Sequence, residues 1–501
     1  MLHLLTSAQI READAYTIGH EPISSLDLME RAAAAFVKVF TDRYPDKAKN
    51  IAVYCGTGNN GGDGLAIARM LCKLNYKNTL VKIARYSDKP TNDFIENLKR
   101  LKSAEVEFEE IRTGDKLPVE KADIIIDALL GSGLNKPLKG DYEKLVKYLN
   151  GLNRTIVSVD VPTGFFCEGE ISNDAVAIKS KLSITFQQPK INFLVPESAP
   201  YIEEFSVVDI GLSNGFIASL NSPYQLIAEQ DIRSILKPRK TFTHKGTYGQ
   251  ALIIAGQPET MGAALLCSSA CAHAGAGLTT ACIPKSGLTA LNTSMPEVMA
   301  IVRAGVKEMD IEWDKFSTIA IGPGLGKKRD TLALLKEVLQ KFDKPVVVDA
   351  DALNLLAANP ELLKQIPKGS IITPHMKEFD RLFGANTSWW GRLETIRQKA
   401  KEHQINIVLK NQYTITGTPD GKLYFNQTGN PAMASGGMGD VLTGVITALL
   451  AQKYTPEQAC ILGTYLHGKS GDDLALPNKK VVVLAGEVAK HIPVVMAKFR
   501  A

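Results

Sequence analysis

The sequence predicts a two-domain α/β protein in which each domain is built on a doubly wound, largely parallel sheet. Short apolar runs typical of strands alternate with helical patterns along most of the chain. Many of these runs end in glycine or aspartate, as is common where the carboxyl ends of strands border a ligand crevice. The alternation pauses once, at a segment rich in turn-forming and basic residues, and then restarts. With 501 residues, both parts are long enough to bury a full core.

Six strand-like runs occupy the first part of the chain, and helical patterns lie between several of them. The runs are Ile51–Cys55, Thr79–Ala84, Ile124–Asp127, Thr155–Asp160, Leu182–Phe186 and Phe205–Asp209. Leu65–Leu74 and Asn92–Leu101 have the apolar spacing of helices. This alternation indicates a three-layer domain with helices packed on a doubly wound sheet.

The segment that follows contains the domain boundary. It holds Asn221-Ser222-Pro223, Lys237-Pro238 and the basic pair Arg239-Lys240, which interrupt regular structure. We expect the first domain to cover residues 1–215 and the second to cover residues 216–501. The residues up to Lys245 are expected to pack onto the second domain as an entry strand and helix.

A glycine-rich segment, from Gly56 to Gly64, follows the first strand and has five glycines in nine residues. At the carboxyl end of a strand this composition favours a ligand crevice, with a plain flexible turn as the alternative. Two neighbouring strand-like runs end in Asp127 and Asp160. Asp160 is a candidate for proton transfer. The oxygens of Asn60, Asp127 and Thr163 are candidate ligands for a hard monovalent cation.

The second part of the chain repeats the strand-and-helix alternation. Its strand-like runs are Ala251–Ala255, Thr279–Ile283, Thr318–Ile321, Val346–Asp349, Ser370–Thr373 and Ile405–Leu409. The helical stretch Gly262–Gly277 is rich in small residues, which permits close packing. Strand ends supply Asp349, Asp351, His375 and Lys410, and we expect all of them on one edge of the sheet. His375 is a candidate ligand residue, and a turn or helix cap is the alternative.

The most informative segment is the loop Asn430–Gly444, which is rich in glycine and runs into an apolar helix. Its glycines and the helix N-terminus favour a bound anion. Asp440 at the junction would repel phosphate, unless it takes a proton from a hydroxyl that attacks phosphorus. An N-capping aspartate after a flexible loop is the alternative. His467, further along the chain, is interpreted as a packed helix residue.

Composition excludes several classes of function. A net charge of +5 without a long basic run gives no indication of nucleic-acid binding. No signal pattern or membrane-spanning apolar stretch is present, so we expect no membrane partner and a cytoplasmic location. The seven cysteines form no C-x-x-C pair, as expected for reduced thiols. Neither a Walker-type phosphate loop nor a zinc-binding cluster of cysteine and histidine occurs.

Taken together, the motifs resemble those of the bifunctional NAD(P)H-hydrate repair enzymes over nearly the whole chain. Residues 59–64 and 159–164 are similar to the epimerase signature of that family. Residues 322–326, 349–354, 373–375 and 436–440 are similar to motifs of the ADP/ATP-dependent dehydratase, which has a ribokinase-like fold. The resemblance therefore implies an N-terminal Rossmann-like domain and a C-terminal ribokinase-like α/β domain. Its implied substrates are NADH and NADPH hydrated at nicotinamide C6.

The resemblance also implies site residues. In the epimerase site, the hydrate contacts would be Asn59, Asn60, Gly61, Gly62, Asp63, Gly131, Ser132, Gly133, Leu134, Asn135, Lys136, Pro137 and Asp160. K⁺ would be bound by Asn60, Asp127 and Thr163. In the dehydratase site, the hydrate contacts would be Ala264, Gly324, His375 and Asp440. The adenine nucleotide, ADP or ATP with Mg²⁺, would contact Lys410, Asn411, Gln412, Tyr413, Thr414 and Gly439. The amides of Gly436, Gly437, Met438 and Gly439 would form an anion hole.

The implied chemistry divides between the domains. Asp160 would move a proton during inversion at C6, with Lys136 as a further candidate. Asp440 would deprotonate the C6 hydroxyl as it attacks the terminal phosphoryl group, and phosphate would then leave. Because ribokinase-like domains often assemble, a homo-oligomer is expected. The sequence departs from the family after Pro374-His375 and in residues 411–413, which lack the usual glycines.

Three alternative functions remain open. The first is a ribokinase-like kinase that phosphorylates a small-molecule alcohol and has a non-catalytic N-terminal nucleotide-binding domain. The first domain alternatively binds a nucleotide-like ligand or a protein without catalysis. A flavin or nicotinamide oxidoreductase is the third alternative, although the glycine segments lack the dinucleotide fingerprint.

Overall fold

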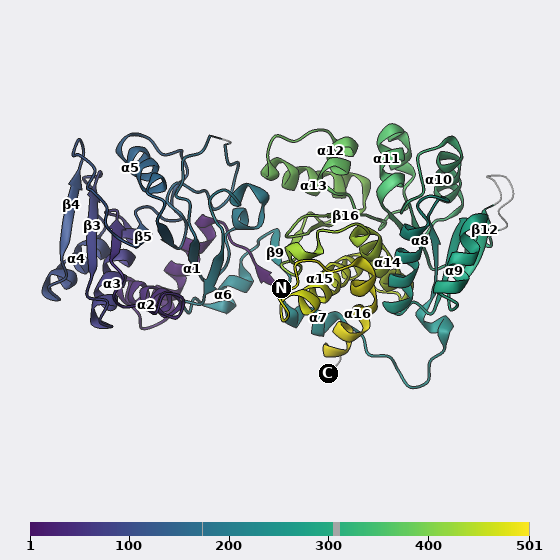
Figure 1. Cartoon of the computed structure of the whole chain (residues 1–501), viewed down its shortest axis with the longest axis horizontal. Helices are drawn as coiled ribbons and strands as arrows, with labels where there is room; N and C mark the ends of the chain where they lie inside the picture. Colours follow the sequence, from purple (N-terminus) through teal and green to yellow (C-terminus); the bar gives the residue numbers. More distant parts are fainter. Residues whose placement is uncertain (173, 304–310, 500–501) are drawn as a thin grey trace. The chain divides into compact units, whose positions relative to one another are not determined.

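A computed structural model describes residues 1–172, 174–303 and 311–499 (Figure 1). The chain divides into two compact units. The N-terminal unit comprises His3–Ser222 with Ser388–Trp390, and the C-terminal unit comprises Met1–Leu2, Pro223–Thr387 and Gly391–Ala501. None of the helices in these described ranges is long and apolar enough to cross a membrane.

The expected boundary after residue 215 needs correction. It would cut helix α6 (Asn214–Ser219), whereas the structure divides between Ser222 and Pro223. Ile217 of α6 is buried in the core of the N-terminal unit, and α6 contacts α1 (Ser7–His20). The turn-forming residues at 221–223 mark the division. A six-residue helix offers too few apolar positions for its packing to be assigned from sequence.

In the described ranges, the N-terminal unit is built on a seven-stranded parallel sheet with the order β4-β3-β2-β5-β6-β7-β8. Its strands are β2 (Ile51–Cys55), β3 (Thr79–Arg85), β4 (Phe108–Arg112), β5 (Ile124–Ala128), β6 (Thr155–Val159), β7 (Leu182–Phe186) and β8 (Phe205–Val208). The edge strand β4 was not predicted, because its charged residues hide the strand pattern. The strand order reverses between β2 and β5, and ligands bind at such a switch point in doubly wound sheets.

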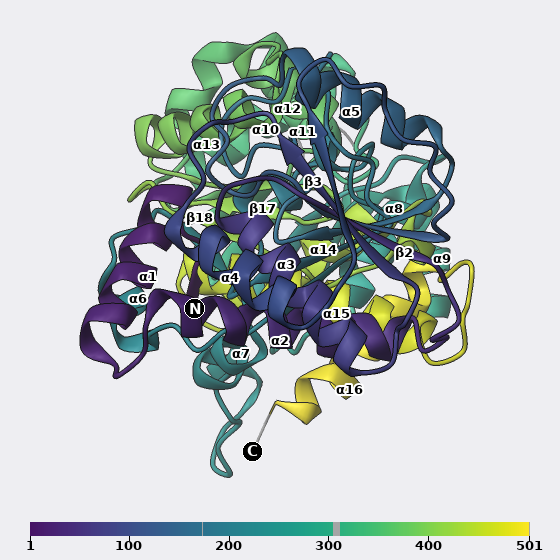
Figure 2. The same ribbon diagram turned by 90° about the vertical axis from the view of Figure 1, so that its left-hand side faces the viewer.

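Helices cover both faces of this sheet. Figures 1 and 2 show α2 (Ser25–Arg43), α3 (Asn59–Lys73) and α4 (Asn92–Ser103) on one face and α5 (Gly140–Gly151) on the other. Two apolar clusters correspond to these faces. One contains residues of the four helices α1, α2, α3 and α4 and of the strands, and the other contains residues of α5 and of the strands. The three-layer arrangement predicted from the sequence is therefore confirmed.

Helix α3 begins earlier than predicted, at Asn59, so that part of the glycine-rich segment is helical. These glycines allow α3 to lie directly against the sheet. A Cβ atom on Gly61 would lie 1.9 Å from the carbonyl oxygen of Gly56, and one on Gly64 would lie 2.6 Å from Cys55 Sγ. The close approach places the N-terminus of α3 at the switch point.

Gly61→Ala is expected to destabilise the N-terminal unit by about 3 kcal/mol, because the new methyl group meets backbone that cannot move aside. Chemical unfolding followed by circular dichroism measures the effect. Gly19→Ala is the matched control, since a Cβ atom there meets nothing within 4 Å. Equal unfolding midpoints for the two variants would show that the close contact at Gly61 does not make the methyl group destabilising.

In the described ranges, the C-terminal unit contains an eleven-stranded sheet with the order β1-β9-β18-β17-β16-β15-β14-β13-β10-β11-β12. Its strands are β1 (Leu2–His3), β9 (Tyr224–Leu226), β10 (Gln250–Ile254), β11 (Leu278–Pro284), β12 (Met299–Arg303), β13 (Thr318–Ile321), β14 (Val346–Val348), β15 (Ile371–Ile372), β16 (Asn406–Leu409), β17 (Ile415–Gly417) and β18 (Leu423–Phe425). Strands β10 to β16 pair in parallel, so their carboxyl ends share one edge as expected. The antiparallel pairs β16–β17 and β17–β18 were not predicted.

Helices also cover both faces of this second sheet (Figures 1 and 2). One face carries α10 (Arg329–Lys341), α11 (Ala350–Ala358), α12 (Met376–Phe383) and α13 (Trp389–His403). The other carries α7 (Glu229–Ile235), α8 (Met261–His273), α14 (Met438–Ala451), α15 (Pro456–Ala475) and α16 (Ala485–Lys498), which share one apolar core. The small residues of α8 let α14 approach closely, since a Cβ atom on Gly444 would lie 2.2 Å from the Cys267 carbonyl oxygen. Strand β9 and helix α7 are the predicted entry strand and helix.

Candidate active sites in the two units

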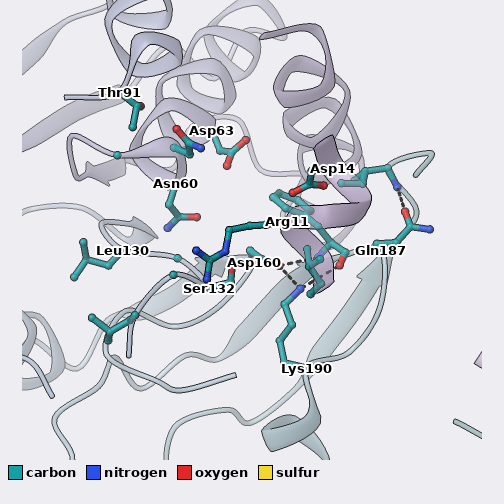
Figure 3. A pocket seen from close by; sticks show the side chains of 18 of the residues that line it. Arg11, Asp14, Asn60, Asp63, Thr91, Leu130, Ser132, Asp160, Gln187 and Lys190 are labelled. Carbon is teal, nitrogen blue, oxygen red and sulfur yellow. Dashed lines mark hydrogen bonds and ion pairs between the residues drawn. The ribbon is translucent and has the colours of Figure 1, made fainter. Parts of the chain in front are cut away.

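A cavity of about 470 Å³ lies at the switch point of the N-terminal sheet (Figure 3). The N-terminal end of α3 and the loop after β5 form one part of its wall, and residues after β6 and β7 form another. Helix α1 contributes a third part, from which Arg11 and Asp14 project into the cavity. The polar or charged residues of the lining include Arg11, Asp14, Asn59, Asn60, Asp63, Thr91, Ser132, Asp160, Gln187 and Lys190.

Asp160 has an unusual backbone conformation, and one oxygen of its carboxylate has three partners. It follows β6 directly and has a φ of +62°, which is strained for a residue other than glycine and is found most often at functional sites. One carboxylate oxygen accepts hydrogen bonds from Thr185 Oγ1 at 3.1 Å and Phe186 N–H at 3.0 Å. The buried ammonium group of Lys190 lies 2.8 Å from the same oxygen. These partners stabilise the ionised carboxylate.

Two further carboxyl groups of the cavity lie in a contrasting environment. Burial raises the pKa of Asp14 to about 6, with a further increase from Asp160 and an opposing effect from Lys190. Burial also raises the pKa of Asp63 well above its ordinary value, and Asp160 and Asp14 add to the increase. Carboxyl groups whose environments differ in this way are suited to separate acid and base roles.

Asp127, one of the predicted cation ligands, is completely buried beneath the loop after β5. It accepts hydrogen bonds from Ser158 Oγ at 2.9 Å, and from Thr163 N–H at 2.9 Å and Thr163 Oγ1 at 2.6 Å. Burial raises its pKa in spite of these bonds. All of these donors are neutral, so a monovalent cation nearby would compensate the buried charge.

Asn60, the third predicted cation ligand, approaches the same loop from α3. A Cβ atom on Gly131 would lie 3.1 Å from the Asn60 amide carbon, and Leu130 N–H donates to Thr163 Oγ1 at 3.0 Å. The Asn60 Nδ2 atom is buried and has no hydrogen-bond partner within the described part of the chain. Residues 130 and 131 therefore contact both Asn60 and Thr163. The carboxylate, hydroxyl and amide oxygens of the three predicted ligands are of the kind that a hard cation prefers.

The cavity includes some predicted contacts and omits others. Of the residues predicted to contact the hydrate, the following line the cavity: Asn59, Asn60, Asp63, Gly131, Ser132, Gly133, Leu134 and Asp160. Gly61 and Gly62 are buried within α3, whereas Asn135, Lys136 and Pro137 are exposed and lie outside the lining of this cavity. The sequence interpretation missed Arg11, Asp14, Gln187 and Lys190. Gln187 and Lys190 follow a predicted strand, so the strand-end rule would have included them, but no motif marks α1.

In the C-terminal unit, the glycine-rich loop leads into the N-terminus of α14, as predicted. Gly437 is the N-cap residue, and its φ of +91° explains why glycine is used there. The first amide groups of a helix have no partner within it, so they are available to an anion. A Cβ atom on Gly439 would lie 3.2 Å from Lys410 Nζ, and the helix terminus therefore lies directly against that ammonium group.

Asp440, in the first turn of α14, belongs to a charged cluster with Asp349 and Lys410. Asp349 is buried and accepts hydrogen bonds from Lys410 Nζ at 2.8 Å and Thr443 Oγ1 at 2.7 Å. Burial raises the pKa of Asp440 to about 6; Asp349 adds to the increase and Lys410 opposes it. A carboxylate with a pKa near neutrality is suited to act as a general base.

A second cavity, of about 290 Å³, lies beside this cluster. Of the residues predicted to contact the nucleotide, Lys410, Asn411, Gln412, Thr414 and Gly439 line this cavity, whereas Tyr413 does not. The remaining polar lining residues are Asn426, Thr428, Asn430, Thr464 and His467, and of these only Asn430 belongs to a segment that the sequence interpretation selected for the site.

His467 lies on α15, as its interpretation as a helix residue requires, but it also lines this second cavity. Burial lowers its pKa to about 4, so the imidazole is neutral near pH 7. Its Nε2 atom is buried without a hydrogen-bond partner in the described ranges. The position of His467 in the cavity wall was not predicted, because helical spacing alone does not show which residues line a cavity.

The predicted hydrate contacts of the C-terminal unit lie outside the second cavity. Ala264 is buried against Gly256, and Gly324 accepts a hydrogen bond from Thr260 Oγ1. His375 is the N-cap of α12: its Nδ1 accepts hydrogen bonds from the amides of residues 377 and 378. The helix-cap alternative therefore describes the side chain of His375, while its backbone pairs with Lys410 at the predicted sheet edge.

Two family models match the chain. The model described as NAD(P)H-hydrate dehydratase matches residues 251–494, and the model of the YjeF-related protein N-terminus matches residues 25–192. Bifunctional NAD(P)H-hydrate repair enzymes are similar over almost the full length. The enzyme from Moorella thermoacetica is 33% identical, over 99% of this chain and 97% of its own. The enzyme from Escherichia coli is 34% identical, over 90% of this chain and 85% of its own.

Solved structures match the C-terminal part of the chain. A ribokinase-like superfamily protein from Enterococcus faecalis has a TM-score of 0.51 and 28% identity, covering 56% of this chain and 98% of that protein. The ADP/ATP-dependent NAD(P)H-hydrate dehydratase from Bacillus subtilis, co-crystallised with ATP and Mg²⁺, has a TM-score of 0.50 and 31% identity. It covers 55% of this chain and 99% of the dehydratase. These similarities confirm the ribokinase-like fold.

Proposed function

The chain belongs to the family of bifunctional NAD(P)H-hydrate repair enzymes, and we propose that each unit carries out one of its two reactions. The N-terminal unit interconverts the R and S epimers of hydrated NADH and NADPH. The C-terminal unit dehydrates the S form with ADP or ATP as the phosphoryl donor. The position of Asp440, at a helix N-terminus and beside Lys410 and Asp349, is the observation that carries this assignment.

Dehydration needs a good leaving group, because hydroxide leaves poorly. Asp440 takes the proton of the C6 hydroxyl while that oxygen attacks the terminal phosphoryl group. The bond from that phosphorus to the bridging oxygen breaks, and AMP or ADP leaves. The amides of residues 436–439 stabilise the charge on the transferring group. Phosphate then leaves as the ring nitrogen donates its lone pair, and loss of a proton from C5 restores the dihydronicotinamide.

The cavity of 290 Å³ beside Gly439 is the proposed nucleotide site. Lys410 at its mouth brings a positive charge to the phosphates, and the polar residues of its lining offer hydrogen bonds to the nucleoside. Mg²⁺ is usually held by phosphate oxygens, waters and one or two carboxylates, so no dedicated protein cage is required. Asp349 and Asp351 are candidate carboxylates, since the charges of both raise the pKa of Asp440. Bound Mg²⁺ would neutralise the oxygens of the nucleotide.

In the epimerase site, Asp160 is the proposed proton-transfer residue, held in place by Lys190. Asn60, Asp127 and Thr163 would hold K⁺, which supplies a fixed positive charge beneath the loop after β5. The N-terminus of α3, beside Gly58 and Asn59, is oriented to bind the phosphates of the substrate. We also propose a homo-oligomeric assembly and a cytoplasmic location. The seven free cysteines support the location.

The proposed function is tested by the recovery of dihydronicotinamide absorbance from a mixture of R and S NADH hydrates. The reaction contains Mg²⁺, K⁺ and either ADP or ATP. Nucleotide-dependent recovery of both epimers is expected. Recovery of only the S fraction would contradict the role of the N-terminal unit. No recovery with either nucleotide would contradict the repair function and favour phosphorylation of a small-molecule alcohol.

The pH dependence of dehydration follows from Asp440. Its pKa is about 6 and it acts as a base only when ionised. We therefore expect kcat/KM for the S hydrate to fall as the pH decreases through about 6, and to level off above it. Initial rates measured between about pH 5 and pH 8 check this. A rate that does not change across this range would contradict a base with this pKa.

A further inference from the structure

Helix α1 brings two charged side chains into the epimerase cavity that no motif of the sequence selects. Figure 3 shows Arg11 and Asp14 projecting from this helix, which ends at His20, into the cavity that Asp63 enters from α3. The matched family model begins at residue 25, so α1 lies outside it. The cavity therefore contains a carboxyl group to which neither the resemblance nor the comparisons assign a role.

The charged groups around Asp14 come from several elements. Asp160 follows β6, Lys190 follows β7, Asp63 lies on α3, and Arg11 lies one turn earlier on α1. Asp160 is paired with the Lys190 ammonium group and accepts two further hydrogen bonds. Asp14 is the member that burial and the neighbouring Asp160 carboxylate drive towards its protonated form.

We propose that Asp14 is the second proton-transfer residue of the epimerase site, acting on the C6 oxygen from α1 while Asp160 acts from the end of β6. This proposal rests on the proposed epimerase function. An epimerisation at C6 that replaces the hydroxyl group needs one group to protonate the departing oxygen and another to deprotonate the incoming water. Asp14 and Asp160 are two carboxyl groups that line one cavity, and Asp160 is the one paired with Lys190.

The proposed step balances as follows for one direction. Asp14 donates its proton to the C6 hydroxyl, the C6–O bond breaks, and water leaves while the ring nitrogen lone pair forms a C=N⁺ bond. Water then adds to the opposite face of C6, the C=N⁺ electron pair returns to nitrogen, and Asp160 takes the proton. Exchange with solvent resets both groups. In the reverse direction the two residues exchange roles.

Asp14 is better suited than Asp63 to this exchange of roles. Burial raises the pKa of Asp63 well above its ordinary value, whereas it raises the pKa of Asp14 to about 6. A group with a pKa near the working pH both gives and takes a proton readily.

The test compares Asp14→Asn with Glu12→Gln, a matched control at an exposed position of the same helix. Starting from R hydrate, we expect Asp14→Asn to lower kcat for epimerisation about 100-fold with a small change in KM, and Glu12→Gln to leave it unchanged. Dehydration of pure S hydrate by both variants shows that the chain is folded. Wild-type protein that dehydrates S hydrate without epimerising R hydrate would instead contradict the underlying function.

Three further readouts separate catalysis by Asp14 from a structural role. The wild-type rate is expected to fall on both sides of an optimum, and Asp14→Asn should lose the change near pH 6. Asp14→Glu should recover part of the activity. In water enriched in ¹⁸O, each epimerisation should place a solvent oxygen on C6. An Asp14→Asn variant with wild-type kcat and pH profile, or an epimerised product that retains its original oxygen, would overturn the proposal.

Discussion

Asp440→Asn is expected to lower kcat for dehydration of S hydrate by about 100-fold or more, because asparagine cannot take the proton of the attacking hydroxyl. The amide keeps nearly the same shape beside Gly439 and Lys410, so nucleotide binding should change little. Stopped-flow recovery of dihydronicotinamide absorbance, with KM for the nucleotide measured separately, checks both parts. Epimerisation of R hydrate in the N-terminal unit should be unaffected.

The matched control for this prediction is Asp343→Asn, an exposed aspartate of the C-terminal unit. It removes the same charge from the chain at a position outside the site, and it should retain wild-type dehydration. If Asp440→Asn also retained near-normal turnover, Asp440 would not be the base. Another group near the N-terminus of α14 would then have to take the proton.

Although Asp440→Asn should lower the rate of dehydration, it should raise the stability of the C-terminal unit at neutral pH. The folded-state pKa of Asp440 is raised from 3.8 to about 6, so the folded chain holds this proton more tightly than the unfolded chain. Stability therefore declines as the pH rises from about 4 to 6, and the loss persists above that range. Asparagine carries no charge and avoids this loss. At pH 7, thermal unfolding of the C-terminal unit should therefore occur at a higher temperature in Asp440→Asn than in wild-type protein.

Asp160→Asn is expected to abolish epimerisation and also to destabilise the N-terminal unit. The Lys190 side chain is only 1% exposed, and removing the carboxylate 2.8 Å away leaves its ammonium group buried without its ion-pair partner. Removing one partner of a buried ion pair typically costs about 3–5 kcal/mol. Asparagine tolerates positive φ, so the backbone at this position is not the cause. Chemical unfolding and the rate of R-hydrate epimerisation measure the two effects.

The double variant Asp160→Asn/Lys190→Met separates the two consequences. Methionine fills the volume of the lysine stem without a charge, so stability should return towards the wild-type value while epimerisation stays lost. Recovery of both stability and epimerisation would mean that Asp160 only balances the charge of Lys190. Equal instability of the single and double variants would show that the uncompensated ammonium group is not the source of the loss.

The fold of the C-terminal unit, and the sheet edge that carries its candidate site, could be predicted because the sequence patterns that indicate them are local. Asp349 and Lys410 both follow short apolar strands, and parallel strands bring such ends to one edge. The glycines just before Asp440 indicate a helix N-terminus, and this signal lies within a few residues of the sequence. Strands β4, β17 and β18 escaped prediction, because three to five residues with charged or mixed patterns carry little periodicity.

The sequence by itself determined two doubly wound α/β units, the glycine-rich helix start at Asp440, and Asp160 at a strand end. These features depend on residues close together in the chain and on spacing rules. Only the tertiary structure decided that Asp14 enters the cavity of Asp160, that Lys190 pairs with that carboxylate, and that His467 lines the cavity of Lys410. Those positions depend on packing between segments distant in sequence. The burial and neighbouring charges that shift the pKa values of Asp14 and Asp440 exist only in the folded chain.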